Sequence, residues 1–237
     1  MTAAISIEGV CKTYAGRAVL REVTLQVPAA TTWGLVGANG AGKTTLIKCL
    51  LDFCALDAGR ISLLGRPHRT VEARRVIAHL PENFLPPHYL TGREFVRYLQ
   101  TLRGIPYSEA DTQAACAALD LDSQALDRPA RTYSKGMTRK LGLVACLVSG
   151  AQLFVLDEPM SGLDPKARAL LKDALGRLAA DGRTVFMSTH ALADVEELCN
   201  AMAILHEGTL RFTGTPAACR AQFGAATLEA AYLATIA

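Results

Sequence analysis

The sequence lacks an apolar stretch long enough to cross a membrane. Its longest uncharged run, residues 141–156, is interrupted by the segment Ser149-Gly150-Ala151-Gln152 and falls short of the roughly 20 apolar residues that a spanning helix needs. The N-terminal segment has no charged start followed by an apolar core, so no secretory signal is expected. We therefore expect a globular chain that would need a partner to work at a membrane.

An excess of charge of either sign is also missing. The 237 residues include 25 Lys and Arg against 22 Asp and Glu, which gives a net charge of +3. This balance is too mild to favour a nucleic-acid partner, and none is expected. The locally basic segment 60–75 is better interpreted as a solvated face than as a ligand patch.

Paired cysteines are the third absence. The seven cysteines form no C-x-x-C pair, and most lie within apolar runs. This distribution is typical of small core residues in a reducing compartment. Because no Cys/His cluster has metal-ligand spacing, a zinc site is not expected.

What the sequence does contain is a phosphate-binding loop of the pattern G-x-x-x-x-G-K-[ST], between an apolar strand at 33–36 and a helical run. Its glycines let backbone N–H groups turn toward phosphate oxygens, and the helix start adds further donors. We expect Lys43 to reach the β- and γ-phosphates and Thr44 to hold Mg²⁺. The loop residues are Gly37, Ala38, Asn39, Gly40, Ala41, Gly42, Lys43, Thr44 and Thr45.

A second candidate site feature is the apolar strand at 153–156, which is followed by two acids. Asp157 is expected to bind Mg²⁺, directly or through water, and Glu158 to polarise a water against the γ-phosphate. The same residues could instead begin a helix after a core strand. The presence of a phosphate loop favours the catalytic interpretation.

The order of the patterns predicts the fold class. Strands alternate with helices, which indicates an α/β fold with a mostly parallel sheet covered on both faces. Strands at 5–10 and 19–27 are expected to form an antiparallel layer beside it. Helical patterns at 92–103, 108–119 and 135–148 interrupt the alternation. We therefore predict one domain with a core at 1–82 and 151–213, a helical subdomain at 83–150 and a helical tail at 214–237.

Five motifs in this order resemble those of ATP-binding-cassette (ABC) ATPases. They are the phosphate loop, the YSKGM segment at 133–137, the acid strand, SGLD at 161–164 and STH at 188–190. The resemblance extends over essentially the whole chain. It implies a P-loop NTPase (RecA-like) core, an inserted helical subdomain, ATP and Mg²⁺ as ligands, and hydrolysis of ATP.

The resemblance also implies roles for residues outside the two main motifs. Tyr14 would stack on adenine, although it could be an ordinary turn tyrosine. His190 resembles the histidine that contacts the γ-phosphate, although a histidine after a strand is often structural. Glu82 stands where the family commonly has glutamine, and its carboxylate could bind Mg²⁺ or water.

The family works as a head-to-tail dimer, so the resemblance implies a homodimer or a pairing with a second ABC ATPase. Ser134 and Gly136 match the signature segment that faces the γ-phosphate of the opposite subunit, and Ser134 should cap a helix beginning near Lys135. Asp164 matches the residue that links the two sites. Lys135 and Met137 depart from the usual LSGGQ pattern, but the serine and the second glycine are retained.

The combination of LPEN and YSKGM resembles the exporter-type branch, whose ATPase works beneath a separate membrane protein of the ABC-2 type. This implies a peripheral position on the cytoplasmic face of the inner membrane. The apolar segment 84–90 could receive a helix of that partner or could simply pack at a hinge. Two alternatives stay open: a soluble ABC ATPase in repair, translation or cofactor assembly, and a P-loop kinase or nucleotide-binding module without turnover.

Overall fold

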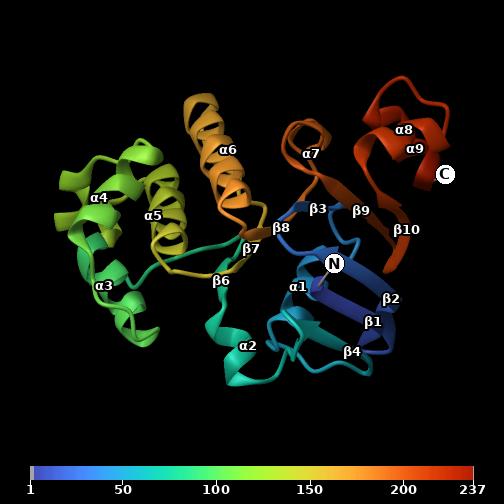
Figure 1. Cartoon of the computed structure of the whole chain (residues 1–237), viewed down its shortest axis with the longest axis horizontal. Helices are drawn as coiled ribbons and strands as arrows, with labels where there is room; N and C mark the ends of the chain where they lie inside the picture. Colours follow the sequence, from blue (N-terminus) through green and yellow to red (C-terminus); the bar gives the residue numbers. More distant parts are fainter. Residues whose placement is uncertain (1–2, 237) are drawn as a thin grey trace.

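Two β-sheets lie side by side in the computed structural model, which describes residues 3–236 (Figure 1). The smaller sheet is antiparallel, in the order β2-β1-β4-β5, and the larger has the order β10-β9-β3-β8-β7-β6. The strands are β1 (Ala3–Tyr14), β2 (Arg17–Pro28), β3 (Thr32–Val36), β4 (Ala58–Leu63), β5 (Arg66–Pro67), β6 (Ile77–Leu80), β7 (Leu153–Asp157), β8 (Thr184–Thr189), β9 (Ala201–His206) and β10 (Thr209–Gly214).

Within the larger sheet, β9, β3, β8, β7 and β6 run parallel, and β10 adds an antiparallel edge. The predicted mostly parallel sheet with an antiparallel layer beside it is therefore confirmed. The register pairs Val36 with Thr189 and Asp157 with Ser188. The carboxyl ends of β3, β7 and β8 consequently meet at one edge, where a parallel sheet presents ligand groups.

Alternation along the buried strands divides the core into two clusters. Leu153 and Val155 of β7 pack into the cluster that also holds the apolar residues of β1 and β2. Phe154 and Leu156 point the opposite way, into the cluster formed with the helices. Because successive side chains of a strand face opposite sides, one short apolar strand supplies both layers.

Helices α3, α4 and α5 form a group at one end of the molecule, whereas α6 and α7 pack on strands of the larger sheet. Figure 1 shows α3, α4 and α5 together on the left, α6 between them and the sheet, and α8 with α9 at the far side. The helices are α1 (Lys43–Leu50), α2 (Val71–Arg75), α3 (Gly92–Leu102), α4 (Glu109–Ala118), α5 (Lys135–Leu147), α6 (Pro165–Ala180), α7 (Leu192–Leu198), α8 (Pro216–Gln222) and α9 (Leu228–Ile236), with 3₁₀ turns η1 (Ser123–Asp127) and η2 (Ala130–Thr132). In residues 3–236, no helix is long and apolar enough to cross a membrane.

Side chains cap the starts of α3, α5 and α6, and the cap at Ser134 is the one that the sequence analysis predicts. Thr91 and Glu94 form a capping box at α3. Ser134 accepts a hydrogen bond from Met137 N at the start of α5, and Asp164 accepts one from Ala167 N at the start of α6. These caps fix the backbone at the signature serine, Ser134, and at Asp164, the residue that by resemblance links the two sites.

Some predicted boundaries are wrong. β1 and β2 are longer than expected and pair as far as Tyr14 with Arg17, so Tyr14 ends a strand instead of lying in a turn. The turns η1 and η2 were not predicted, because such short 3₁₀ segments carry little periodic signal.

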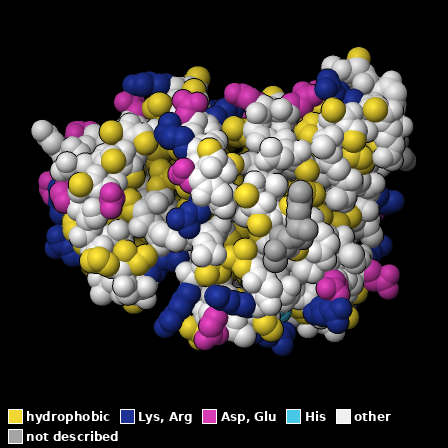
Figure 2. Space-filling model, in the orientation of Figure 1, with side chains coloured by type: hydrophobic (Ala, Val, Ile, Leu, Met, Phe, Trp, Pro, Cys, Tyr) yellow, Lys and Arg dark blue, Asp and Glu magenta, His cyan; other side chains and the backbone are white. Residues whose placement is uncertain are grey.

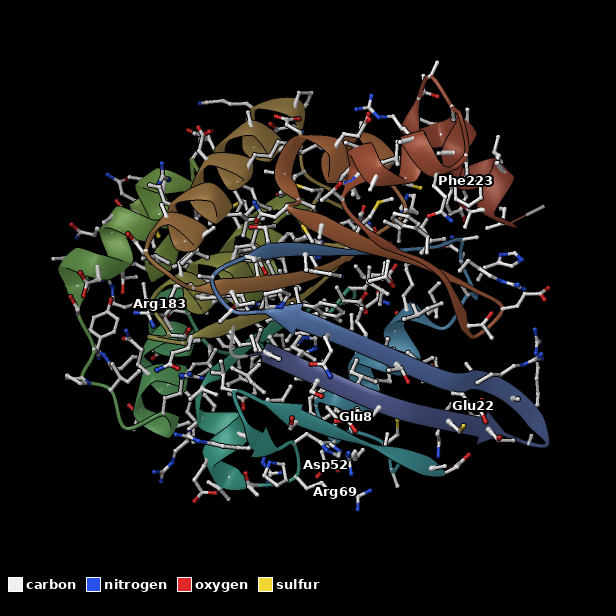
Figure 3. All side chains as sticks on the ribbon, turned by 45° about the vertical axis from the view of Figure 1, so that its right-hand side comes forward. Glu8, Glu22, Asp52, Arg69, Arg183 and Phe223 are labelled. Atoms are coloured by element: carbon white, nitrogen blue, oxygen red, sulfur yellow. The ribbon has the colours of Figure 1, made fainter. Side chains whose placement is uncertain are left out.

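The basic segment 60–75 forms a solvated, charge-paired surface, as predicted. Arg60 Nε donates to Glu8 Oε2 at 2.7 Å, and Arg69 Nε lies 3.5 Å from Asp52 Oδ1 (Figure 3). Asp52 also pairs with Arg74. Exposed pairs of this kind contribute only about 0–1 kcal/mol each. On the face shown in Figure 2, basic and acidic side chains are likewise interspersed.

Candidate functional site

A cavity of about 820 Å³ opens at the carboxyl edge of the larger sheet, at the phosphate loop. It brings together most of the loop, Glu158 after β7, and Glu82 after β6. Its lining residues are Arg17, Ala18, Val19, Arg21, Ala38, Asn39, Gly40, Ala41, Gly42, Lys43, Thr44, Thr45, Glu82, Glu158, His206, Glu207 and Gly208. Its size is within the range of small-molecule sites.

The loop's shape depends on glycine at two positions. Gly42, the N-cap of α1, has φ 110°, and a Cβ there would lie 3.0 Å from Val19 O. A Cβ on Gly37 would lie 2.4 Å from Leu205 O. Within the described chain no side chain caps α1, so its first N–H groups stay available to an anion. The cradle therefore fits a phosphate chain.

Lys43 is buried and reaches across the loop. Its Nζ donates to Gly37 O at 2.6 Å and to Ala38 O at 3.3 Å, and it lies 3.6 Å from Glu158 Oε1. The ammonium is thus held between the loop carbonyls and a carboxylate, inside the wall of the cavity. A buried cation at this position favours a phosphate ligand.

Asp157 is held by hydroxyl groups on both sides. Thr44 Oγ1 donates to Asp157 Oδ2 at 3.0 Å, and Ser188 Oγ donates to Asp157 Oδ1. No cluster of three or more His, Cys, Asp or Glu side chains able to hold a metal occurs in residues 3–236. A hydroxyl and one carboxylate are nevertheless the hard oxygen donors that suit Mg²⁺, which takes few protein ligands beside substrate phosphates. The residues present therefore fit that ion.

Glu158 has an unusual backbone conformation. Its φ is 48°, in the left-handed region that non-glycine residues seldom adopt. Its N–H donates to Ser188 O at 3.2 Å and to Ser188 Oγ at 3.0 Å. Its Oε1 lies 3.0 Å from His190 Nδ1, and the imidazole is 62% exposed. The carboxylate thus lies between Lys43 and His190, at the cavity wall.

Not all predicted residues line this cavity. Tyr14 lies outside its lining, with Lys12 Nζ 5.2 Å from its ring centroid. A side-chain hydrogen bond with Cys54, together with burial, raises the pKa of Tyr14 to about 12. The other predicted residues outside the lining are Gly37, Ser134, Gly136, Asp157, Asp164 and His190.

Several lining residues were missed by sequence reasoning. Arg17 and Arg21 reach the cavity from the β1–β2 hairpin, and residues 206–208 reach it from the β9–β10 turn. Strand β2 is joined to the β9–β10 turn where Arg21 N donates to Gly208 O at 2.8 Å, and this turn is joined to the phosphate loop where Gly208 N donates to Ala41 O at 3.1 Å. Only the long-range pairing of strands brings these segments together, so no local motif could have indicated them.

Comparison with known proteins decides the family. The family model described as ABC transporter matches residues 20–161, more than half of the chain. The chain belongs to the ABC transporter family. The match confirms the resemblance to ABC ATPases that the sequence motifs of this ABC protein indicated.

Individual relatives agree with this assignment. An uncharacterised ABC transporter ATP-binding protein of Synechocystis is 38% identical over 83% of this chain and 56% of its own length. The Nod factor export ATP-binding protein I of Mesorhizobium japonicum is 35% identical over 92% of this chain and 65% of its own. A solved ATP-binding subunit of an ABC transporter superposes with a TM-score of 0.90 at 30% identity, covering 98% of this chain and 99% of that one. The P-loop NTPase fold is thus confirmed, although this ABC protein spans little more than half of its cyanobacterial relative.

Proposed function

We propose that this ABC protein binds and hydrolyses ATP and powers transport through a separate membrane-spanning partner. One observation carries the proposal: a single cavity joins the uncapped start of α1, the buried Lys43 ammonium and the Glu158 carboxylate. A phosphate cradle alone would suit any nucleotide-binding module. A carboxylate held at its wall adds a group able to activate water.

For binding, the N–H groups of residues 37–45 would surround the phosphates, and Lys43 would pair with the β- and γ-phosphates. Thr44 and Asp157, with Glu82 at the rim, would hold Mg²⁺, which when bound supplies positive charge to the phosphate oxygens. Tyr14 and the neighbouring hairpin would face the adenine. The 3.0 Å hydrogen bond from Thr44 Oγ1 to Asp157 Oδ2 supports the assignment of these two residues to the Mg²⁺ site.

For hydrolysis, Glu158 would accept a proton from the attacking water. The water oxygen forms a bond to the γ-phosphorus while the bond to the β–γ bridging oxygen breaks, which yields ADP and phosphate. His190, 3.0 Å from Glu158 Oε1, would orient the carboxylate and contact the γ-phosphate. Lys43 would stabilise the negative charge of the transferred group.

A second copy would complete the site. Ser134, Gly136 and Asp164 lie outside the lining of their own chain's cavity, at or near the capped starts of α5 and α6. A helix start attracts anions, so the start of α5 suits the γ-phosphate that a partner subunit binds. The partner would be a second copy of this chain or another ABC ATPase. With ATP and Mg²⁺, the Glu158→Gln variant should scatter light as a particle of twice the 25.3 kDa chain mass. A monomer under those conditions would contradict the pairing.

The membrane partner would dock on the helical segment. We propose that residues 83–150 act as a subdomain between the core (1–82 and 151–213) and an ABC-2-type permease, on the cytoplasmic face of the inner membrane. A hollow of about 380 Å³ near Phe84 and Tyr133 supports a docking role, as does the 84% exposure of Leu85. The Nod factor relative is named as an export protein, which supports a role of this ABC protein in export.

Two experiments test the proposal. The purified chain, incubated with ATP and Mg²⁺, is expected to release phosphate, and absence of release would overturn the catalytic part. A tagged chain purified from native membranes is expected to bring down a protein with several membrane spans. Recovery with ribosomes, DNA-repair proteins or cofactor-assembly proteins instead would overturn the transporter part.

A further inference from the structure

Arg139 lies at the centre of an unusual set of contacts beneath the candidate site. It is on α5, five residues after Ser134, and only 5% exposed. A guanidinium carries five N–H donors in a fixed plane. Here all five are directed at backbone carbonyl oxygens, which belong to Pro81, Glu82, Asp157, Glu158 and Pro159.

The five carbonyls belong to two loops that are far apart in the sequence. Nη1 donates to Pro81 O at 2.7 Å and to Glu82 O at 3.0 Å, after β6. Nη2 donates to Asp157 O at 2.7 Å and to Glu158 O, at the end of β7. One side chain therefore joins the backbones of Glu82 and Glu158, the two carboxylate residues that line the cavity from these loops.

The Glu158 backbone needs such support. A left-handed non-glycine residue costs about 1–3 kcal/mol and persists only where its surroundings over-determine it. Ser188 holds the N–H of Glu158 from the β8 side, and Arg139 holds its carbonyl from the α5 side. With both ends of the residue fixed, the carboxylate direction is set by χ angles alone.

The close packing of α5 against β6 places Arg139 within hydrogen-bonding distance of both loops. Gly142 allows α5 to approach β6 closely, because a Cβ there would lie 2.6 Å from Leu80 Cδ1 and 2.8 Å from Phe84 Cδ1. Burial lowers the pKa of the Arg139 guanidinium, and the Asp157 carboxylate opposes this. A buried cation is costly, so its presence between the loops of Glu82 and Glu158 calls for a reason beyond filling space.

We propose that Arg139 is a positioning residue for ATP hydrolysis: it fixes the Glu158 backbone against the Glu82 loop so that the Glu158 carboxylate addresses the attacking water. The inference rests on the proposed hydrolytic function. Arg139 contacts the two loops and acts through Glu158. Its loss should therefore slow the chemical step and leave ground-state binding of ATP, which depends on the phosphate loop, largely intact.

The test is steady-state ATP hydrolysis by Arg139→Lys, with ATP affinity and Tm measured on the same samples. Lysine keeps the charge but lacks the planar fork that spans both loops. We expect kcat to fall at least about tenfold while KM and ATP affinity change less than about threefold. Arg139→Gln keeps a planar donor but is shorter and cannot reach both loops, so its kcat should be lower than that of Arg139→Lys.

Arg103→Lys is the matched control. Arg103 also donates to three backbone carbonyls, those of Arg75, Ile77 and Ser149, but at the opposite end of β6. The Arg103→Lys variant should have a lower Tm than the wild type, but its kcat should not fall selectively as that of Arg139→Lys does. Wild-type kcat in a folded Arg139→Lys, or equal losses of kcat in both variants, would overturn the inference. Lack of phosphate release by the wild type would instead overturn the proposed function.

Discussion

Lys43 Nζ lies 3.6 Å from Glu158 Oε1, and the side chains are only 6% and 10% exposed. The pair joins the phosphate loop to the end of β7 and places a cation and a carboxylate at the wall of one cavity. Their charges have opposite consequences for a triphosphate. The ammonium attracts the phosphates, whereas the carboxylate repels them and is suited to accept a proton from water.

The first prediction concerns Lys43. Lys43→Ala removes the buried cation that we propose pairs with the phosphates, so ATP affinity should fall at least about tenfold, or about 1.4 kcal/mol. Binding of a fluorescent ATP analogue, competed with ATP, measures this directly. Lys48→Ala removes an exposed lysine from the same helix and is the control. Equal affinities of the two variants would refute the assigned role of Lys43.

The second prediction concerns Ser188, whose hydroxyl joins Asp157 Oδ1 to Glu158 N. Ser188→Ala leaves a buried carboxylate oxygen without this donor and should cost about 1–3 kcal/mol of unfolding free energy. It should also raise the Mg²⁺ concentration needed for half-maximal ATP hydrolysis, because Asp157 loses its orientation. Urea unfolding and Mg²⁺ titration of phosphate release measure the two effects.

Thr184→Ala is the control for Ser188, since it removes a buried hydroxyl at the other end of β8, where Thr184 Oγ1 accepts from Ala30 N at 3.0 Å. It should destabilise the fold without changing the Mg²⁺ dependence. A shift of the Mg²⁺ midpoint in Thr184→Ala as large as in Ser188→Ala would show that general destabilisation causes it.

The third prediction is a pH dependence of stability through His79. Burial lowers the pKa of His79 below its ordinary value of 6.5, although the Nδ1 bond to Val155 O at 2.8 Å opposes this. The unfolded chain therefore binds this proton at higher pH than the folded one. The stability that His79 contributes is complete above pH 6.5 and is lost as the pH falls through the folded pKa.

His79→Gln cannot titrate, so its unfolding free energy should depend less steeply on pH below 6.5 than that of the wild type. The difference in slope is at most about 1.4 kcal/mol per pH unit, the value for one proton. Urea unfolding at several pH values checks this. Identical slopes, or an NMR titration of His79 above its ordinary pKa, would contradict the prediction.

The extent to which the site could be predicted follows from the range of its contacts. The phosphate loop, the acid pair and the cap at Ser134 are local patterns, because a turn or a helix start constrains neighbouring residues. The alternation of strands and helices indicated the parallel sheet for the same reason. The structure bears out these features of the fold, while the catalytic and binding roles stay predictions.

The remaining contacts depend on packing between distant segments. Arg17 and Gly208 reach the cavity only because β2 and the β9–β10 turn meet. Arg139 lies two residues beyond the signature segment, yet its partners are about 20 and 60 residues away, across a close approach of α5 to β6 that periodicity does not specify. The left-handed φ of Glu158 likewise has no local sequence signal.

The rate of ATP hydrolysis by Glu158→Gln, compared with that of Glu207→Gln, tests most directly the central claim that Glu158 activates the attacking water. Both changes remove a carboxylate from the same cavity lining, but Glu158 is the one paired with Lys43. We predict that Glu158→Gln binds ATP at least as tightly as the wild type and releases phosphate at least about 100-fold more slowly. Glu207→Gln should retain turnover within about threefold. Wild-type turnover by Glu158→Gln would contradict the account.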